Sequence, residues 1–191
     1  MPEVKESPEI AGVLVVVPDV HGDARGRFVE SFRQEWLPVS APPMIQGNRV
    51  DRRTGALVGL HFHLHQSDYW YVIHGRARTV LHDLRRGSPT LGRTLLVDMD
   101  GDAGPGVYIP PGVAHGFAAH TDLTLTYLVD GYYNPDDELG VAWDDPDIAA
   151  DWGVTDPVLS GRDQANPRRR DLPEALTPTF GPPGTPVGLP R

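Results

Sequence analysis

The sequence predicts an all-β protein: a jelly-roll barrel of short strands with a few short helical turns and an extended C-terminal tail. Glycine and proline account for 21 and 20 of the 191 residues and occur throughout the chain, which leaves few windows for a long helix. Eight strand-like runs alternate with turn-forming segments such as HGDARG, RRTG, RRGSP and DGDAGPG. Many short strands at this spacing are typical of a sandwich or barrel.

The predicted strands are rich in β-branched and aromatic residues, and each is bounded by turn-forming residues. In chain order they are VLVVV (13–17), RFVESF (27–32), LVGLHFHLH (57–65), YWYVIHG (69–75), RTVLHDL (78–84), RTLLVDM (93–99), GVYIPPG (106–112) and LTLTYLVDGYY (123–133). Segments 33–38 and 144–152 have room for a helical turn or two. We therefore expect one barrel domain over residues 1–166 and a proline-rich tail over 167–191.

Composition excludes several classes of function. The net charge of −9 opposes binding to nucleic acid. The absence of cysteine excludes disulfides and thiolate metal sites. The first residues do not read as a secretory signal, and no apolar run reaches the roughly 18 residues of a membrane span. We expect a cytoplasmic protein that binds neither nucleic acid nor membrane.

Histidines alternate with apolar residues in the run at 57–65. Successive side chains on a strand point to opposite faces, so His61, His63 and His65 share one face, and Leu60, Phe62 and Leu64 share the other. The histidines line either a wet cavity inside the barrel or the solvent-facing side. The segment IPPGVAHGF at 109–117 brings His115 to the start of another strand, which favours the cavity.

Together the two histidine segments resemble the motifs of the cupin superfamily, whose barrel is a double-stranded β-helix. The first motif is matched by H-F-H at 61–63, Asp68 in place of glutamate, and Gly75; the second is matched by Gly104, Pro110, Gly112 and His115. The resemblance implies a metal site formed by His61, His63, Asp68 and His115. Such a donor set suits Zn, Fe, Mn, Ni or Cu as a divalent ion. This gives one candidate function, a metal-dependent isomerase, cyclase or oxygenase acting on a carbonyl compound.

A more extensive resemblance covers residues 12–163 and points to the dTDP-4-dehydrorhamnose 3,5-epimerase family, a metal-free branch of the same barrel. Its landmarks occur in order as DARGRFVESF (23–32), QGN (46–48), LVGLH (57–61), DLRRGSPTLG (83–92), IPPGVAHGF (109–117), TYLVDGYYNP (126–135), WDDP (143–146) and LSGRD (159–163). The resemblance implies that the chain epimerises a nucleotide-linked 4-keto-6-deoxy sugar without a cofactor. It also implies a homodimer in which N-terminal strands cross to the partner's sheet.

The epimerase resemblance also implies roles for individual residues. His61 is the base, supported by Asp163, and Tyr127 is the acid on the opposite side. A 4-keto group acidifies the hydrogens on C3 and C5, so a base of near-neutral pKa can remove one, and inversion needs a proton donor on the other face. His115 lines the sugar pocket, and the residues implied in nucleotide binding are Arg25, Phe28, Glu30, Gln46 and Asn48.

The chain departs from the epimerase pattern at two basic positions. Val58 and Asp68 stand where the family has an arginine and a lysine that clamp the pyrophosphate. Asp68 and His63 are also the residues that complete the cupin metal pattern, yet a metal-bound His61 nitrogen cannot accept a substrate proton. Four arginines either rebuild a phosphate site or are surface charges: Arg52, Arg53, Arg76 and Arg78. A third class, a non-catalytic sugar-binding cupin, would leave Tyr127 and Asp163 with structural roles only.

Overall fold

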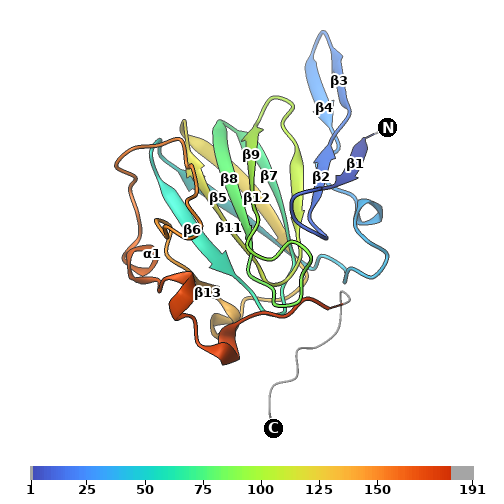
Figure 1. The fold of residues 1–191 in the computed structure, drawn as a ribbon. Helices are drawn as coiled ribbons and strands as arrows, with labels where there is room; N and C mark the ends of the chain where they lie inside the picture. Colours follow the sequence, from blue (N-terminus) through green and yellow to red (C-terminus); the bar gives the residue numbers. More distant parts are fainter. Residues whose placement is uncertain (1, 182–191) are drawn as a thin grey trace.

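Two antiparallel sheets form the barrel in the computed structural model, which describes residues 2–181 (Figure 1). The six-stranded sheet has the order β1 (Glu3–Glu6), β2 (Leu14–Val17), β10 (Gly106–Ile109), β7 (Asp68–His74), β12 (Leu123–Val129) and β5 (Gln46–Arg52). The five-stranded sheet has the order β13 (Leu139–Gly140), β6 (Leu57–Phe62), β11 (Val113–Ala119), β8 (Arg76–Asp83) and β9 (Thr94–Asp100). A separate hairpin, β3 (Val20–Asp23) and β4 (Gly26–Val29), projects from the body.

The predicted all-β fold is confirmed, and each of the eight predicted runs overlaps a strand. Strands β1, β3, β5 and β13 were not predicted, and β11 (Val113–Ala119) lies outside the eight runs, although a strand was expected to begin near His115. Strand β5, with the sequence QGNRVDR, has few apolar residues because one of its faces is exposed and the other lines a polar pocket. Such a strand lacks the apolar alternation by which a half-buried strand is recognised.

Helical structure is sparse. A 3-10 helix at Gln34–Trp36 lies within the predicted segment 33–38. Segment 144–152, where a helical turn or two was expected, contains hydrogen-bonded turns but no helix. The α-helix α1 (Gly161–Ala165) instead follows Ser160, whose side chain accepts a hydrogen bond from the Asp163 amide and so caps the first turn. No helix among residues 2–181 is long and apolar enough to cross a membrane.

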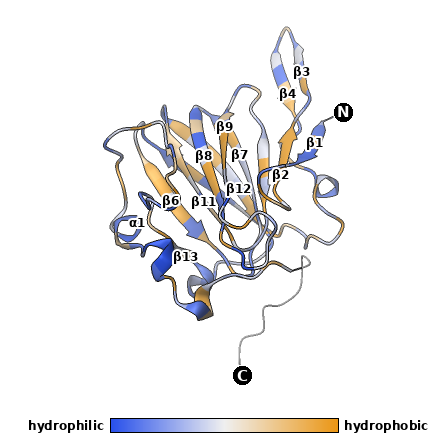
Figure 2. Ribbon diagram, in the orientation of Figure 1, coloured by the Kyte–Doolittle hydropathy of each residue, from blue (hydrophilic) through white to orange (hydrophobic). Residues whose placement is uncertain are grey.

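Both faces of β6 are covered, although the sequence suggested that only one would be. Leu60 and Phe62 are fully buried in a cluster outside the five-stranded sheet, where they pack with Val141, Ile148 and Trp152. A second cluster lies between the sheets and forms part of the wall of the cavity described below. Figure 2 shows hydrophobic residues concentrated on the strands. The outer cluster accounts for the apolar row of β6, which leaves the histidine side of the strand free to face the barrel interior.

The first part of the predicted tail packs against the barrel. The Arg86 amide donates to the Pro178 carbonyl and the Phe180 amide donates to the Arg86 carbonyl, each at 2.8 Å. The Arg85 guanidinium lies 4.9 Å from the centroid of the Phe180 ring. Two 3-10 helices, Arg169–Asp171 and Glu174–Leu176, interrupt the extended path. Residues 182–191 of the predicted tail lie outside the described residues, and a domain boundary at residue 166 stays a prediction.

Folding stability is expected to depend on the protonation of His82. This residue is fully buried, and burial lowers its pKa from 6.5 to about 4. The folded state therefore favours neutral His82, and the resulting stability is present above pH 6.5 and lost as the pH falls towards 4. The free energy of unfolding should decrease by about 3 kcal/mol over this range on account of His82 alone.

Urea unfolding of the wild type and of His82→Leu between pH 7 and pH 4 measures this contribution. The variant should show a shallower decrease, whereas His65→Ala, which removes an exposed histidine, should follow the wild type. Equal pH dependence in the wild type and His82→Leu would refute the assignment.

Candidate active site

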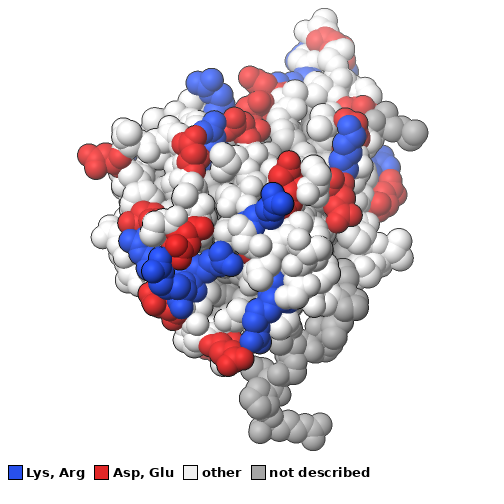
Figure 3. Space-filling model, in the orientation of Figure 1, with Lys and Arg blue, Asp and Glu red and all other residues white. Residues whose placement is uncertain are grey.

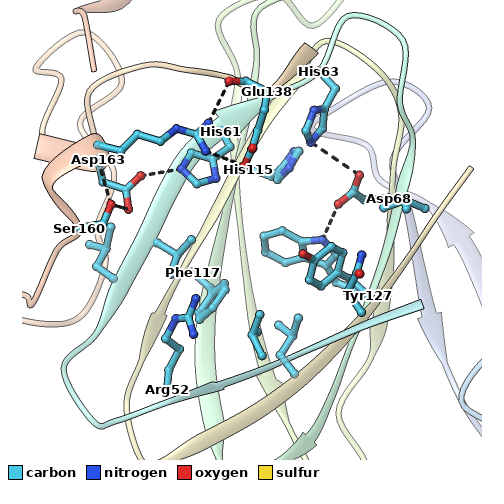
Figure 4. Close-up of a pocket in the computed structure, with 18 of the residues that line it drawn as sticks. Arg52, His61, His63, Asp68, His115, Phe117, Tyr127, Glu138, Ser160 and Asp163 are labelled. Atoms are coloured by element: carbon cyan, nitrogen blue, oxygen red, sulfur yellow. Dashed lines mark hydrogen bonds and ion pairs between the residues drawn. The ribbon is translucent and has the colours of Figure 1, made fainter. Parts of the chain in front are cut away.

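A cavity of about 670 Å³ lies between the two sheets. Its walls come from strands of both sheets and from two later segments, 133–138 and 158–163. Alternate residues of β5 and β12 point into it: Gln46, Asn48, Val50, Arg52, Leu125, Tyr127 and Val129. The volume is in the range of sites that enclose a small organic ligand. Figure 4 shows these walls with polar side chains converging from opposite sides.

Close contact between β6 and β11 places two histidines side by side. His61 and His115 are directly paired in the register, and a bulge follows between His115 and Phe117. A Cβ added to Gly59 would lie 2.7 Å from the Gly116 Cα atom, so any larger residue would push the strands apart. The Gly59 φ of 118° is also disfavoured for other residues. Gly59 belongs to the segment LVGLH and Gly116 to the segment VAHGF. The close approach of the two strands explains why each segment has a glycine next to its histidine or one residue away from it.

His61 is paired with a carboxylate that is 102 residues away in the sequence. Its Nε2 atom lies 2.5 Å from Oδ1 of Asp163. The second carboxylate oxygen of Asp163 accepts a hydrogen bond from the Ser160 hydroxyl at 2.9 Å, and the Asp163 amide donates to the same hydroxyl at 3.1 Å. This reciprocal cap fixes the carboxylate at the start of α1. Asp163 is therefore both a helix-capping residue and the partner of His61.

The charge on Asp163 determines which imidazole nitrogen of His61 is available. Burial by itself would raise the pKa of the Asp163 carboxyl, but the hydrogen bond and charge of His61, together with the Ser160 hydroxyl, hold that pKa below its usual value. An ionised carboxylate only accepts hydrogen bonds, so Nε2 of His61 carries the hydrogen and donates it. Nδ1 is left as the nitrogen that can accept a proton.

Tyr127 approaches the cavity from the other sheet. It lies on β12, between Asn48 on β5 and Trp70 on β7, whereas His61 lies on β6 of the five-stranded sheet. Burial, and the negative charges of Asp68 and Glu138, raise the pKa of the Tyr127 phenol. The phenol therefore keeps its proton at neutral pH. A ligand in the cavity would have an imidazole on one side and a phenol on the other (Figure 4).

Of the four residues with the cupin metal spacing, the structure brings three together. His63, Asp68 and His115 each offer a ligand atom, and these atoms lie within 4.8 Å of one another. His61 is outside this group because its Nε2 atom is directed at Asp163. Burial lowers the pKa of His115 to about 4, so this imidazole is neutral at pH 7. The predicted strand 57–65 is shorter in the structure, because β6 ends at Phe62. His65 therefore does not continue the histidine face of the strand, and its side chain is exposed.

The five residues implied in nucleotide binding fall into two groups. Gln46 and Asn48 line the cavity, and the Gln46 amide donates to Oδ1 of Asn48 at 2.9 Å. The other three lie on or next to the projecting hairpin and do not line the cavity of their own chain. Arg25 pairs with Asp23, Phe28 is 63% exposed, and Glu30 pairs with Arg33.

Some cavity residues have no signal in the sequence. Arg162 donates to Oε1 of Glu138 at 2.5 Å and to its carbonyl at 3.0 Å, and both residues line the cavity. Arg52 also lines the cavity, whereas Arg53 pairs with Asp122 outside it and Arg78 with Asp98 and Asp151. Acidic and basic side chains are interspersed on the face shown in Figure 3. Arg52 is one of the four arginines that the sequence offered for a phosphate site, and the fold places it at the cavity together with Arg162, which the sequence did not single out.

Comparison with known proteins finds relatives among the dTDP-sugar epimerases. The sequence model of the dTDP-4-dehydrorhamnose 3,5-epimerase family matches residues 7–171. An epimerase of that name from Sinorhizobium fredii is 34% identical over 176 residues, which are 88% of this chain and 90% of the relative. The Escherichia coli epimerase is 35% identical over 167 residues, covering 82% and 89%.

Solved structures agree with the sequence relatives. NovW, a 4-keto-6-deoxy sugar epimerase from the novobiocin gene cluster of Streptomyces spheroides, superposes with a TM-score of 0.86 at 32% identity, covering 94% of each chain. The Legionella pneumophila dTDP-6-deoxy-D-glucose-3,5-epimerase in complex with dTDP-4-keto-L-rhamnose superposes with a TM-score of 0.88 at 30% identity, covering 95% of this chain and all of that one, 100%. The resemblance read from the eight sequence landmarks is thereby confirmed: this chain belongs to the dTDP-4-dehydrorhamnose 3,5-epimerase family.

Proposed function

We propose that this chain epimerises a nucleotide-linked 4-keto-6-deoxy sugar by moving a proton from one face of the sugar to the other. The observation that carries the proposal is the position of a carboxylate-paired imidazole, His61, and a protonated phenol, Tyr127, on opposite sheets facing one cavity. Inversion at a carbon next to a ketone requires this arrangement, in which a base removes the hydrogen and an acid returns one to the other face.

Three side chains carry out the proton transfer. His61 accepts the hydrogen from C3 or C5 at Nδ1, and the negative Asp163 stabilises the imidazolium that forms. Tyr127 then donates its phenolic proton to the opposite face of the same carbon, and exchange with solvent restores both groups. His115 lines the sugar end of the cavity, while Gln46 and Asn48 contact the nucleotide.

The cavity retains basic side chains for a diphosphate despite the two departures from the family pattern. Val58 lines the cavity where the family has arginine, and it offers no charge. Arg52 and Arg162 line the same cavity and are able to contact phosphate oxygens. They support a sugar nucleotide as the ligand. The same chemistry supports a cytoplasmic location, where nucleotide sugars are made and used.

A homodimer would bring the remaining nucleotide-binding residues to the cavity. Arg25, Phe28 and Glu30 lie away from the cavity of their own chain, and the N-terminal region carries exposed apolar side chains at Val4, Val17 and Val20. Exchange of this region between two chains would cover these side chains and extend the partner's cavity. Analytical ultracentrifugation should then give twice the mass of one chain, and a monomeric mass would contradict the proposal.

Incubation of the purified protein with a dTDP-linked 4-keto-6-deoxy sugar tests the proposed function. Nuclear magnetic resonance should show inversion at C3, C5 or both. The same sugar without the nucleotide is the control, and it should react poorly because it lacks the diphosphate and base. Binding without inversion under any condition would favour a non-catalytic sugar-binding protein instead.

Replacement of Asp163 by asparagine should impair positioning of the base. Asparagine keeps the size of the side chain but removes the charge that holds Nε2 of His61 as a donor, so kcat should fall by about 10- to 100-fold with little change in KM. Steady-state kinetics from pH 6 to pH 9 give the measurement. Asp156→Asn, a change at an exposed acid outside the cavity lining, is the matched control and should behave as wild type.

A further inference from the structure

Three hydrogen-bond acceptors converge beside the proposed base. His63 follows the end of β6, Asp68 begins β7, and His115 lies on β11, so three separate segments of the chain supply them. One ligand atom from each lies within 4.8 Å of the other two, and all three residues line the cavity (Figure 4). The two imidazole rings are 5.5 Å apart, centroid to centroid.

Backbone carbonyls orient both imidazoles. Nδ1 of His63 lies 2.7 Å from the Asp137 carbonyl oxygen, and Nδ1 of His115 lies 2.9 Å from the Val113 carbonyl oxygen. A carbonyl oxygen can only accept, so each Nδ1 carries the hydrogen and each Nε2 of a neutral ring presents a lone pair. Imidazoles that bind metals are held in the same way, by a hydrogen bond from the nitrogen that is not a ligand.

The third acceptor is a buried carboxyl group. The Asp68 side chain is 3% exposed, and its oxygens accept from Nε2 of Gln66 at 2.9 Å and from Nε1 of Trp70 at 3.0 Å. Both donors are uncharged. Among the ion pairs of the described residues, Asp68 is paired with His63 alone, at 4.0 Å from its Nε2 atom, which is too long for a hydrogen bond. A buried carboxylate facing two imidazole lone pairs needs a positive charge.

We propose that His63, Asp68 and His115 bind one divalent transition-metal ion beside the epimerase base. Two imidazoles and one carboxylate are a usual donor set for Fe(II), Mn(II), Co(II) and Zn(II), and three protein ligands leave positions open towards the cavity. His61 is not a ligand because its Nε2 atom is held by Asp163. Base and metal site are therefore separate residues, which removes the competition for His61 that the sequence pattern implied.

The ion would restore a positive charge at a point where the family pattern has lysine and this chain has Asp68. When bound, it would supply a Lewis acid in the cavity that holds the proposed base. That consequence rests on the proposed function, whereas the binding of the ion itself does not. Binding is measured without substrate, so failure of the metal proposal and failure of the epimerase proposal are distinguishable.

Metal titration of the full chain, produced without a polyhistidine tag and stripped with a chelator, tests the proposal. Cobalt(II) chloride should give a visible absorption spectrum that saturates at one ion per chain. Zinc chloride should raise Tm, since an ion that binds only the folded state stabilises it. Elemental analysis after gel filtration gives the stoichiometry.

Four variants locate the ion. His63→Gln and Asp68→Asn should each bind cobalt at least about 100-fold more weakly, while circular dichroism of the stripped proteins confirms that they are folded. His65→Ala, which removes the exposed neighbour, and His61→Asn, which removes the base, should bind as the wild type does. Absence of saturable binding in the wild type, undiminished binding in His63→Gln, or loss of binding in His61→Asn would each overturn the proposal.

Discussion

Replacing His61 with asparagine is expected to reduce kcat by about 1,000-fold or more, because it removes the group that accepts the hydrogen from the sugar. Asparagine is too short to reach the position of the imidazole Nε2 atom, but Asp163 is still held by the hydroxyl of Ser160 through two hydrogen bonds of 2.9 and 3.1 Å. The capped carboxylate and the cavity should therefore be preserved, and KM should change little. Steady-state kinetics on a dTDP-linked 4-keto-6-deoxy sugar provide the measurement.

His65→Asn is the matched control for this experiment. It makes the same substitution four residues away, at a histidine that is exposed and does not line the cavity. Its kcat should equal that of the wild type. A His61→Asn enzyme whose kcat stays within a factor of about ten would contradict the role of His61 as the base, since general-base catalysis is ordinarily worth 100-fold or more.

Replacing Tyr127 with phenylalanine should separate hydrogen removal from inversion. His61 would still remove a hydrogen and return it to the same face, so exchange with solvent at C3 or C5 should continue. Net inversion should fall by about 100-fold or more, because no acid remains on the other face. Deuterium incorporation and product configuration, measured in the same reaction by nuclear magnetic resonance, report the two steps separately.

Tyr133 is the other tyrosine in the cavity lining, so it is the alternative candidate for the acid and the control for Tyr127→Phe. It also lines the cavity but is 68% exposed, whereas Tyr127 is half-buried. The pKa of both phenols is raised, that of Tyr127 mainly by burial and that of Tyr133 mainly by the negative charge of Glu138. Tyr133→Phe should retain inversion at nearly the wild-type rate. If Tyr133→Phe loses inversion and Tyr127→Phe keeps it, the acid has been assigned to the wrong tyrosine.

The sequence predicts the apolar strands well because their alternation follows directly from burial on one face. It does not predict β5, whose inward residues Gln46, Asn48 and Arg52 are polar because they line the cavity. Strand β6 shows a further limit: whether its histidines or its apolar residues face inward depends on the outer cluster around Trp152, which lies some 90 residues further along the chain. Local periodicity shows which side chains share a face of the strand. Packing against distant segments determines which of the two faces points into the barrel.

The site is predicted in part. Only the family resemblance pointed to Asp163, since an acidic residue in the first turn after a glycine-containing turn ordinarily has a capping role. In the structure it both pairs with the N-cap Ser160 and contacts His61. Linear spacing grouped His61 with His63, Asp68 and His115, whereas the fold directs His61 to Asp163. Spacing along a strand fixes the face on which a side chain lies. The partner of that side chain depends on tertiary contacts.

The most direct test of the central claim is deuterium incorporation by the chelator-treated wild-type protein in heavy water, with a dTDP-linked 4-keto-6-deoxy sugar as substrate. If His61 and Tyr127 transfer the proton, deuterium should appear at C3 or C5 together with inverted configuration at that carbon. A sugar recovered with its original configuration and without deuterium, from protein shown to be folded and to bind it, would contradict the account.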